Sequence, residues 1–157
     1  MVAMQPTPTT PITTTGTASK FFWPVRVYWE DTDAGGIVFY ANYLKYFERA
    51  RTEWLRSLGL EQWQLQSSYA GIFVVSEANI KYLRSARLDD QLLVSAQLSS
   101  LGRSSLIITQ EVRLREQSAA RDEEALLCTG SVRVGWVDRA SLRPSRFPTT
   151  VQDALRR

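Results

Sequence analysis

The chain has 157 residues, of which 44% are hydrophobic and 22% charged, and its formal net charge is +3. This composition is typical of one globular domain with its own core, and so small a charge gives no reason to expect a nucleic-acid partner. There is no histidine and only one cysteine, Cys128, which excludes a Ser-His-Asp triad, a histidine-bound metal and a thiolate cluster.

Residues 1–20 are rich in proline and threonine and contain almost no large apolar side chains, so we expect a disordered tail. The stretch from Phe21 to Trp29 alternates and is rich in aromatic and β-branched residues, which indicates a strand. Pro24 lacks a backbone donor and therefore favours either an edge position for this strand or the beginning of the strand. The turn residues EDTDAGG at 30–36 then interrupt the pattern.

A helix is predicted from Tyr40 to Leu58, because apolar side chains recur there every three or four residues. The predicted apolar face consists of Tyr40, Tyr43, Phe47, Ala50, Trp54 and Leu58. Gly59 follows as a C-terminal cap, and a short second helix is expected over residues 61–67.

Four further strands are predicted after Gly71, separated by short polar segments. Their expected bounds are Ile72–Tyr82, Gln91–Leu101, Ser104–Arg115 and Ala125–Val137. Short connections favour antiparallel pairing, and one long helix can cover one face of a five-stranded sheet. The sequence therefore predicts an α+β domain over residues 21–150 and a C-terminal tail over 151–157. Such a small two-layer unit leaves apolar surface open, so we expect a homodimer or a homotetramer.

The turn before the helix crowds three carboxylates into four positions. A helix N-terminus carries unpaired N–H groups and a partial positive charge, and Gly35 and Gly36 leave the backbone open to a ligand. A carbonyl placed there would be polarised, and Asp33, a few residues before the helix, would lie beside it as a base or a nucleophile. A simpler interpretation is that Asp31, Thr32 or Asp33 caps the helix.

The segment 21–59 contains the pattern YxEDTDAGGxVxxxxYxxxxERARTExL. It closely resembles the start of the Tol-Pal-associated acyl-CoA thioesterases, in the hydroxybenzoyl-CoA thioesterase group of hotdog-fold proteins. The segments YLRSARLDD at 82–90 and SSLIITQEV at 104–112 continue the resemblance, which covers about residues 21–150. The fold that it implies, a curved antiparallel sheet around one long helix, agrees with the predicted pattern.

The resemblance implies a cytoplasmic enzyme that hydrolyses an acyl-CoA thioester to free acid and CoA without a metal or cofactor. Asp33 matches the acidic catalytic residue, and Tyr40 lies where a backbone N–H at the helix N-terminus faces the thioester carbonyl. Many Tol-Pal-associated members have histidine at this position, whereas Tyr40 resembles the hydroxybenzoyl branch. The backbone N–H at this position can donate whether the side chain is tyrosine or histidine, so this role does not depend on the substitution. Glu48 matches a helical acid that faces the acyl group from a neighbouring subunit.

Several residues have a second interpretation. Glu48 could instead pair with Arg51 or Lys45 on the surface. We interpret Asp31 as a turn-forming residue or a solvated charge, and Cys128 as a small buried apolar residue.

CoA carries phosphates, so basic residues near the predicted turns are candidate contacts. Arg103 in the LGRSS turn is the first candidate, and the others are Lys81, Arg84 and Arg87. A non-catalytic module that binds acyl thioesters or an acyl carrier protein, linked to envelope assembly, is the alternative to a hydrolase. A hotdog dehydratase fits less well, because those enzymes usually pair histidine with an acid.

Overall fold

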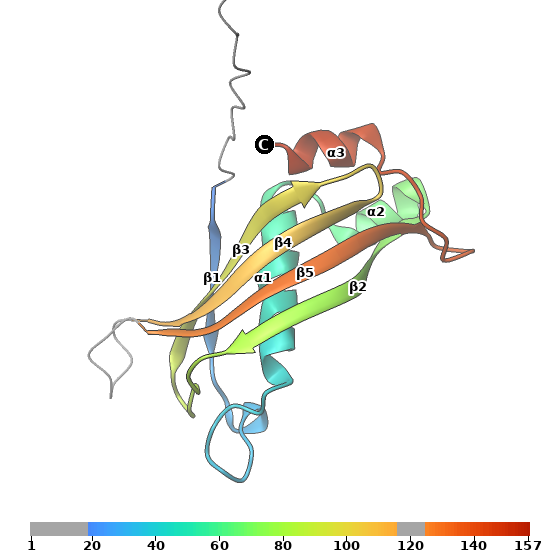
Figure 1. Cartoon of the computed structure of the whole chain (residues 1–157). Helices are drawn as coiled ribbons and strands as arrows, with labels where there is room; N and C mark the ends of the chain where they lie inside the picture. Colours follow the sequence, from blue (N-terminus) through green and yellow to red (C-terminus); the bar gives the residue numbers. More distant parts are fainter. Residues whose placement is uncertain (1–18, 116–124) are drawn as a thin grey trace, which may run out of the picture.

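Five strands form one antiparallel sheet in the computed structural model, which describes residues 19–115 and 125–157 (Figure 1). The strands are β1 (Phe21–Arg26), β2 (Gly71–Tyr82), β3 (Gln91–Leu101), β4 (Ser105–Leu114) and β5 (Leu126–Asp138). Their order is β1-β3-β4-β5-β2, with antiparallel pairing between all neighbours. The predicted fold class is therefore confirmed. The tail predicted over residues 1–20 lies, apart from its last two residues, outside the described part of the chain.

The two edges of the sheet are β1 and β2. Pro24 lies inside β1, so of the two positions that its missing N–H favoured, the edge of the sheet is the one observed. The strand ends three residues earlier than predicted, because Trp29–Asp31 forms a short 3-10 helix, η1. In that turn the Asp31 carboxylate accepts the N–H of Tyr28 at 2.8 Å.

The segment between β2 and β3 is not a hairpin. β2 pairs with β5, so residues 83–90 cross the end of the sheet before β3 begins beside β1. On the way the N–H of Leu83 donates to the carbonyl of Leu127, and the carbonyl of Ala86 accepts the N–H of Val38 at 2.9 Å. This crossing brings the end of β2 beside the loop that precedes the long helix.

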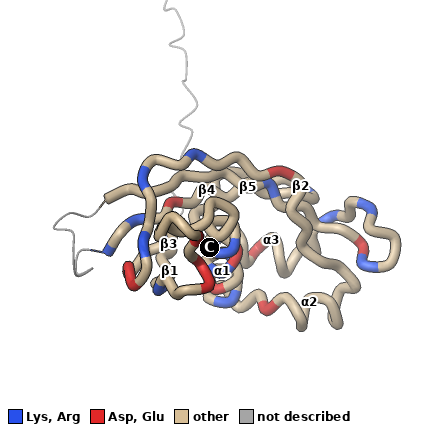
Figure 2. The backbone as a smooth tube through the Cα atoms, turned by 90° about the horizontal axis from the view of Figure 1, so that it is seen from below, with Lys and Arg blue, Asp and Glu red and all other residues tan. Residues whose placement is uncertain are grey.

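The long helix, α1 (Asn42–Ser57), lies under the arch of the sheet (Figure 2). Most of the predicted apolar face is buried, including Tyr43, Phe47, Ala50 and Trp54. The prediction for Tyr40 is wrong, because this residue precedes the helix and its side chain is 63% exposed.

Two shorter helices lie on the same side of the sheet as α1 (Figure 2). They are α2 (Gln62–Tyr69) and α3 (Thr149–Leu155). We expected residues 151–157 to be a tail outside the domain, but Val151, Ala154 and Leu155 are buried in the core. Their spacing of three and four gives a short apolar face that the sequence interpretation overlooked. None of the helices described is long and apolar enough to cross a membrane.

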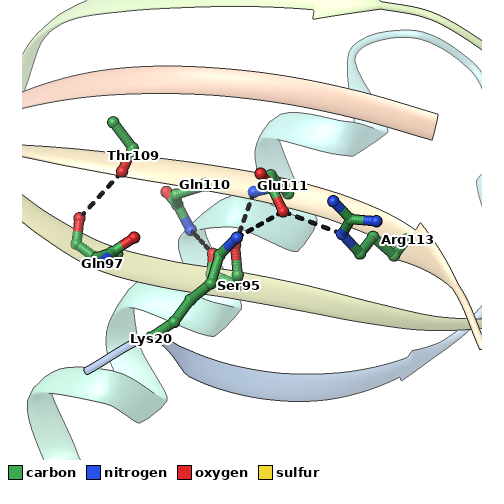
Figure 3. A network of polar contacts seen from close by, with 7 residues as sticks. All are labelled: Lys20, Ser95, Gln97, Thr109, Gln110, Glu111 and Arg113. Carbon is green, nitrogen blue, oxygen red and sulfur yellow. Dashed lines mark hydrogen bonds and ion pairs between the residues drawn. The ribbon is translucent and has the colours of Figure 1, made fainter. Parts of the chain in front are cut away.

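Gln110 joins the centre of the sheet to α1 through its side chain, and Figure 3 shows its hydrogen bond to Ser95 on the neighbouring strand. Its side chain is 1% exposed, and its amide donates to the carbonyls of Phe47 and Ser95, both at 3.0 Å. Its amide oxygen accepts from the Arg51 guanidinium at 2.9 Å. The next residue, Glu111, points to the opposite face, as alternation along a strand requires, where it pairs with Lys20 and Arg113.

Replacing Gln110 with methionine should destabilise the protein while keeping the volume of the side chain. The variant loses three buried hydrogen bonds, one of them to a charged group, so we expect the free energy of unfolding to fall by about 2–4 kcal/mol. Urea unfolding measures this, with Gln64→Met on the exposed side of α2 as control, where the change should stay within about 0.5 kcal/mol. Equal stability of the two variants would contradict the structural role of Gln110.

Candidate active site

Asp33 lies in a tight loop that the backbone itself holds in place. Its N–H donates to the carbonyl of Ile37 at 2.9 Å, and its own carbonyl accepts the N–H of Gly36 at 3.0 Å. Gly36 has φ 75°, a left-handed conformation that favours glycine. One carboxylate oxygen, Oδ1, accepts the N–H of Gly35 at 2.8 Å. Both glycines of the DAGG turn thus shape the backbone around the carboxylate.

The loop exposes Asp33 to a surface pocket of about 350 Å³. The start of α1 contributes Tyr40 and Tyr43 to its walls, and the end of β2 and the following segment contribute Tyr82 and Arg84. No hydrogen bond from the described residues reaches the Oδ2 atom of Asp33. One oxygen of this carboxylate is therefore available to a substrate or a water molecule.

The helix-capping interpretation is wrong. The helix begins at Asn42, nine positions after Asp33, and its N-cap residue, Ala41, makes no side-chain cap. Asp31 is 5% exposed, and its carboxylate binds the N–H of Tyr28. Its role as a turn-forming residue is thus confirmed.

The backbone amides of Tyr40 and Ala41, just before the helix, make no hydrogen bond within the described residues. The carbonyls of the same two peptide groups are both occupied. The carbonyl of Phe39 accepts the N–H of Asn42 at 2.9 Å, and the carbonyl of Tyr40 accepts the hydroxyl of Tyr82 at 2.9 Å. The Tyr40 amide, in a residue that lines the Asp33 pocket, is thus left as an unused donor.

Glu48 is not among the residues that line the Asp33 pocket. It lies on α1 and lines a second pocket of about 110 Å³, whose apolar lining includes Phe73 and Ile108. The Glu48 carboxylate accepts the hydroxyl of Thr52 at 2.7 Å. Burial lowers the pKa of Arg51, and the nearby charge of Glu48 opposes this effect. Within one chain, the two acids of the predicted site therefore face different cavities.

The candidate phosphate contacts are divided between the two ends of the sheet. Arg84 lines the Asp33 pocket. Arg103 lies in the turn between β3 and β4, at the other end of the sheet from the Asp33 loop (Figure 1). Eleven residues of β3 separate the two ends, which corresponds to about 30 Å. The carbonyl of Arg103 accepts the N–H of Phe147 at 2.9 Å.

Sequence reasoning did not assign a role to Tyr82, although its ring and hydroxyl form part of the pocket wall. Its position as the last residue of a strand was predicted. The sequence hint that Tyr82 has a role is its place as the first residue of the YLRSARLDD segment, which carries part of the family resemblance. Strand periodicity cannot show that this segment runs close to the start of the helix.

The sheet order, the central helix and the pocket together define a hotdog-fold protein. A model of the thioesterase superfamily matches residues 35–133, and the chain belongs to this superfamily. The predicted thioesterase family is thereby confirmed.

Several curated relatives are acyl-CoA thioesterases by name. The chain is 40% identical over 135 residues to the acyl-CoA thioesterase YbgC of Haemophilus influenzae, which covers 86% of this chain and 93% of that protein. It is 39% identical over 131 residues to the acyl-CoA thioester hydrolase YbgC of Escherichia coli O157:H7, with 83% and 92% covered.

Solved structures agree with the fold. A probable thioesterase from Bartonella henselae is 29% identical and has a TM-score of 0.73, covering 83% of this chain and 100% of that chain. A 4-hydroxybenzoyl-CoA thioesterase variant in complex with 4-hydroxybenzoyl-CoA has a TM-score of 0.78 at 18% identity, with 87% and 98% covered. At that identity the second likeness concerns the fold alone.

Cys128 should be unreactive in the folded protein. It is completely buried, as predicted, and burial raises the pKa of its thiol to about 12. The reactive thiolate is therefore suppressed through the neutral range and returns when unfolding restores the ordinary pKa. We expect an aromatic disulfide reagent at pH 8 to react at least about 10³-fold faster in urea than in buffer. Free CoA serves as the reference thiol, and prompt labelling of the folded protein would refute the assignment.

Proposed function

We propose that this protein hydrolyses acyl-CoA thioesters to the free acid and CoA, with Asp33 as the catalytic carboxylate. The observation that carries the proposal is the pocket in which a carboxylate with one uncommitted oxygen accompanies the unpaired amide of Tyr40. Relatives named acyl-CoA thioesterases, matched along most of both chains, support the substrate class.

The reaction adds water across the bond between the acyl carbon and sulfur. Asp33 Oδ2 either attacks the acyl carbon or removes a proton from the attacking water. In both routes the carbonyl oxygen gains negative charge, which the N–H of Tyr40 stabilises; such a donor contributes about 10²–10³ in rate. In both routes the sulfur of CoA then leaves and takes up a proton. Where water attacked, the acid is formed in this step; where Asp33 attacked, an anhydride between Asp33 and the acyl group remains, and water hydrolyses it to release the acid and restore the carboxylate.

Gly35 and Gly36 support this chemistry through the backbone. The Gly35 N–H holds one carboxylate oxygen, which leaves the other to the substrate. A Cβ on Gly35 would approach that same carboxylate oxygen to 3.1 Å. Glycine at both positions thus preserves the orientation of Asp33 and an open approach for the thioester.

Glu48 acts, in our proposal, on the acyl group of a substrate bound to the neighbouring subunit. Within one chain Glu48 lines a different pocket from Asp33, which supports a site that takes these two acids from different subunits. The edge strand β2 is free along one side and exposes Val74 and Val75, 39% and 48% accessible, which a second copy would cover. We therefore propose a homodimer, or a homotetramer built from such dimers, with each active site at the dimer interface.

Binding of the CoA phosphates is assigned to basic residues around each pocket. Arg84, in the pocket wall, is the first contact within the chain, while Arg103 could serve only a site formed with another subunit. The resemblance to Tol-Pal-associated thioesterases leads us to propose a cytoplasmic enzyme linked to envelope assembly. The acyl group could also be carried by an acyl carrier protein instead of CoA, and this second type of substrate is included in the test below.

Replacing Asp33 with asparagine should abolish most of the activity without unfolding the protein. We expect thiol release to fall by about 10²–10⁴-fold, because the amide can neither attack nor accept a proton. The amide oxygen can still accept the Gly35 N–H, so the melting temperature should stay within about 2 °C. The assay uses short, long and aromatic acyl-CoAs, and one acyl carrier protein carrying the same acyl group.

Asp153→Asn, in the exposed position of α3, is the matched control and should keep wild-type activity. A folded wild-type protein that is inactive on every thioester of the panel would favour the non-catalytic binding module. Full activity of Asp33→Asn would remove Asp33 from the mechanism.

Mixing two inactive variants tests whether Asp33 and Glu48 act from different subunits. In a heterodimer of Asp33→Asn and Glu48→Gln, one site carries both changes and the other carries neither. Random exchange of subunits should restore about a quarter of wild-type activity. Thiol release before and after joint refolding measures the recovery, with each variant refolded alone as the control. No recovery from two folded, exchanged variants would place both residues in sites formed by one chain.

A further inference from the structure

Two cavities lie next to each other along the first half of β2 and share two wall residues. The first is the Glu48 pocket of about 110 Å³, and the second is the α2 cavity of about 120 Å³, whose wall includes part of helix α2. Both are lined by Phe73 and Gln62. Along β2, Val75 lines the Glu48 pocket and Gly71 lines the α2 cavity, with Phe73 between them. Phe73 and Gln62 therefore form a partition between the two spaces.

Both halves of this partition are held by their neighbours. The Phe73 ring packs edge to face against Trp136, with 5.0 Å between centroids, and lies 6.2 Å from the ring of Phe147. Trp136 is 2% exposed, so it is a fixed support within the core. On the other side, the side-chain amide of Gln62 donates to the hydroxyl of Thr52 at 3.1 Å. The partition is thus a wall that moves only if core contacts break.

The Glu48 pocket suits a short apolar group. Six of its lining side chains are apolar and come from α1, β2, β4 and β5: Leu55, Phe73, Val75, Leu106, Ile108 and Val134. An apolar cavity of about 150 Å³ accommodates a benzene molecule. A pocket of about 110 Å³ therefore has room for a chain of about four carbons.

The proposed dimer brings the Glu48 pocket of one subunit close to the Asp33 pocket of the other. The Glu48 pocket reaches the surface at Val75, which is half exposed on the free edge strand. Antiparallel pairing of two copies of β2 about a two-fold axis at the middle of the strand sets the first half of one copy beside the second half of the other. The second half ends at Tyr82, which lines the Asp33 pocket. An acyl group held at Asp33 can thus extend into the neighbouring Glu48 pocket.

We infer that Phe73, together with Gln62, limits the length of the acyl group that the enzyme accepts. A chain of about four carbons fills the Glu48 pocket and ends at the partition, whereas a longer chain needs the α2 cavity behind it. The inference deepens the proposed function and rests on it. Removing the Phe73 ring joins the two cavities, and each methylene group that the added space buries strengthens binding about fourfold.

Replacing Phe73 with alanine tests the partition through the chain-length profile. We expect the ratio of kcat/KM for octanoyl-CoA to kcat/KM for butanoyl-CoA to rise at least about tenfold above its wild-type value, because the added carbons gain apolar surroundings. Phe147→Ala is the matched control, since this ring packs against Phe73 but lines neither cavity, and it should keep the wild-type ratio. An unchanged ratio in folded Phe73→Ala, or an equal rise in Phe147→Ala, would overturn the inference.

The smaller change Phe73→Leu keeps the test decisive if the alanine variant fails to fold. Leucine preserves more of the core packing but still shortens the partition, so we expect the same ratio to rise about threefold. Phe147→Leu is its control and should keep the wild-type ratio. No rise in folded Phe73→Leu would contradict the role of the partition.

Binding of uncleavable analogues does not need turnover. S-butyl-CoA and S-octyl-CoA are thioethers without an acyl carbonyl, and calorimetry measures their dissociation constants. The octyl thioether should bind wild type and Phe147→Ala no more tightly than the butyl thioether, and should bind Phe73→Ala about tenfold more tightly than the butyl thioether. A wild type that already prefers the octyl thioether tenfold would overturn the inference, as would equal affinities in Phe73→Ala.

The two proposals can fail separately. A folded wild type that cleaves no thioester of the panel would contradict the proposed hydrolase, while the thioether affinities would still decide the role of the partition. An active wild type whose chain-length ratio and thioether affinities are the same in Phe73→Ala would contradict the partition alone.

Discussion

The geometry of the candidate site depends on the backbone carbonyl of Asp31. This oxygen accepts the N–H of Phe39 at 2.9 Å and the side-chain amide of Asn42 at 2.8 Å. The two hydrogen bonds hold the start of α1 beside the turn that follows β1. The loop between Asp31 and Phe39 must therefore reverse its direction tightly. That loop carries Asp33, and its return to the helix places Tyr40 in the same pocket. The buried Asp31 carboxylate completes the anchor by binding Tyr28.

A second set of contacts fixes the helix relative to the sheet. Gln110 binds the carbonyl of Phe47 and the guanidinium of Arg51, so the middle of α1 cannot slide along β4 without breaking buried hydrogen bonds. Arg51 in turn lies close enough to Glu48 for their charges to interact. The same contacts that stabilise the core therefore hold the second acid in the wall of the pocket that contains Phe73 and Ile108. The two acids face different cavities, which is the structural basis for proposing a site shared between subunits.

Much of the fold followed from periodicity. The bounds of β3 agree with the predicted range, and those of β2, β4 and β5 differ from it by no more than one residue at each end. The order of the strands in the sheet could not be predicted in this way, because periodicity identifies the residues that form a strand but not the strand with which they pair. β2 pairs with β5, although β3 comes next in the sequence. Periodicity also misplaced Tyr40, whose spacing fits the apolar face although the Asp31 contacts delay the helix to Asn42. The short apolar face of α3 was too brief to stand out from a loop.

The sequence by itself determined the fold class, the absence of histidine chemistry and the acidic turn with its two glycines, because these depend on composition, local spacing and backbone freedom. The resemblance carried by the same turn pointed to Asp33, Tyr40 and Glu48. Only the tertiary structure decided that Asp33 keeps an uncommitted oxygen, that Glu48 faces another cavity and that Tyr82 reaches the start of α1. The last of these depends on the place of β2 at the edge beside β5, which brings its last residue to a peptide group 42 positions earlier in the chain, and no local pattern encodes such a contact.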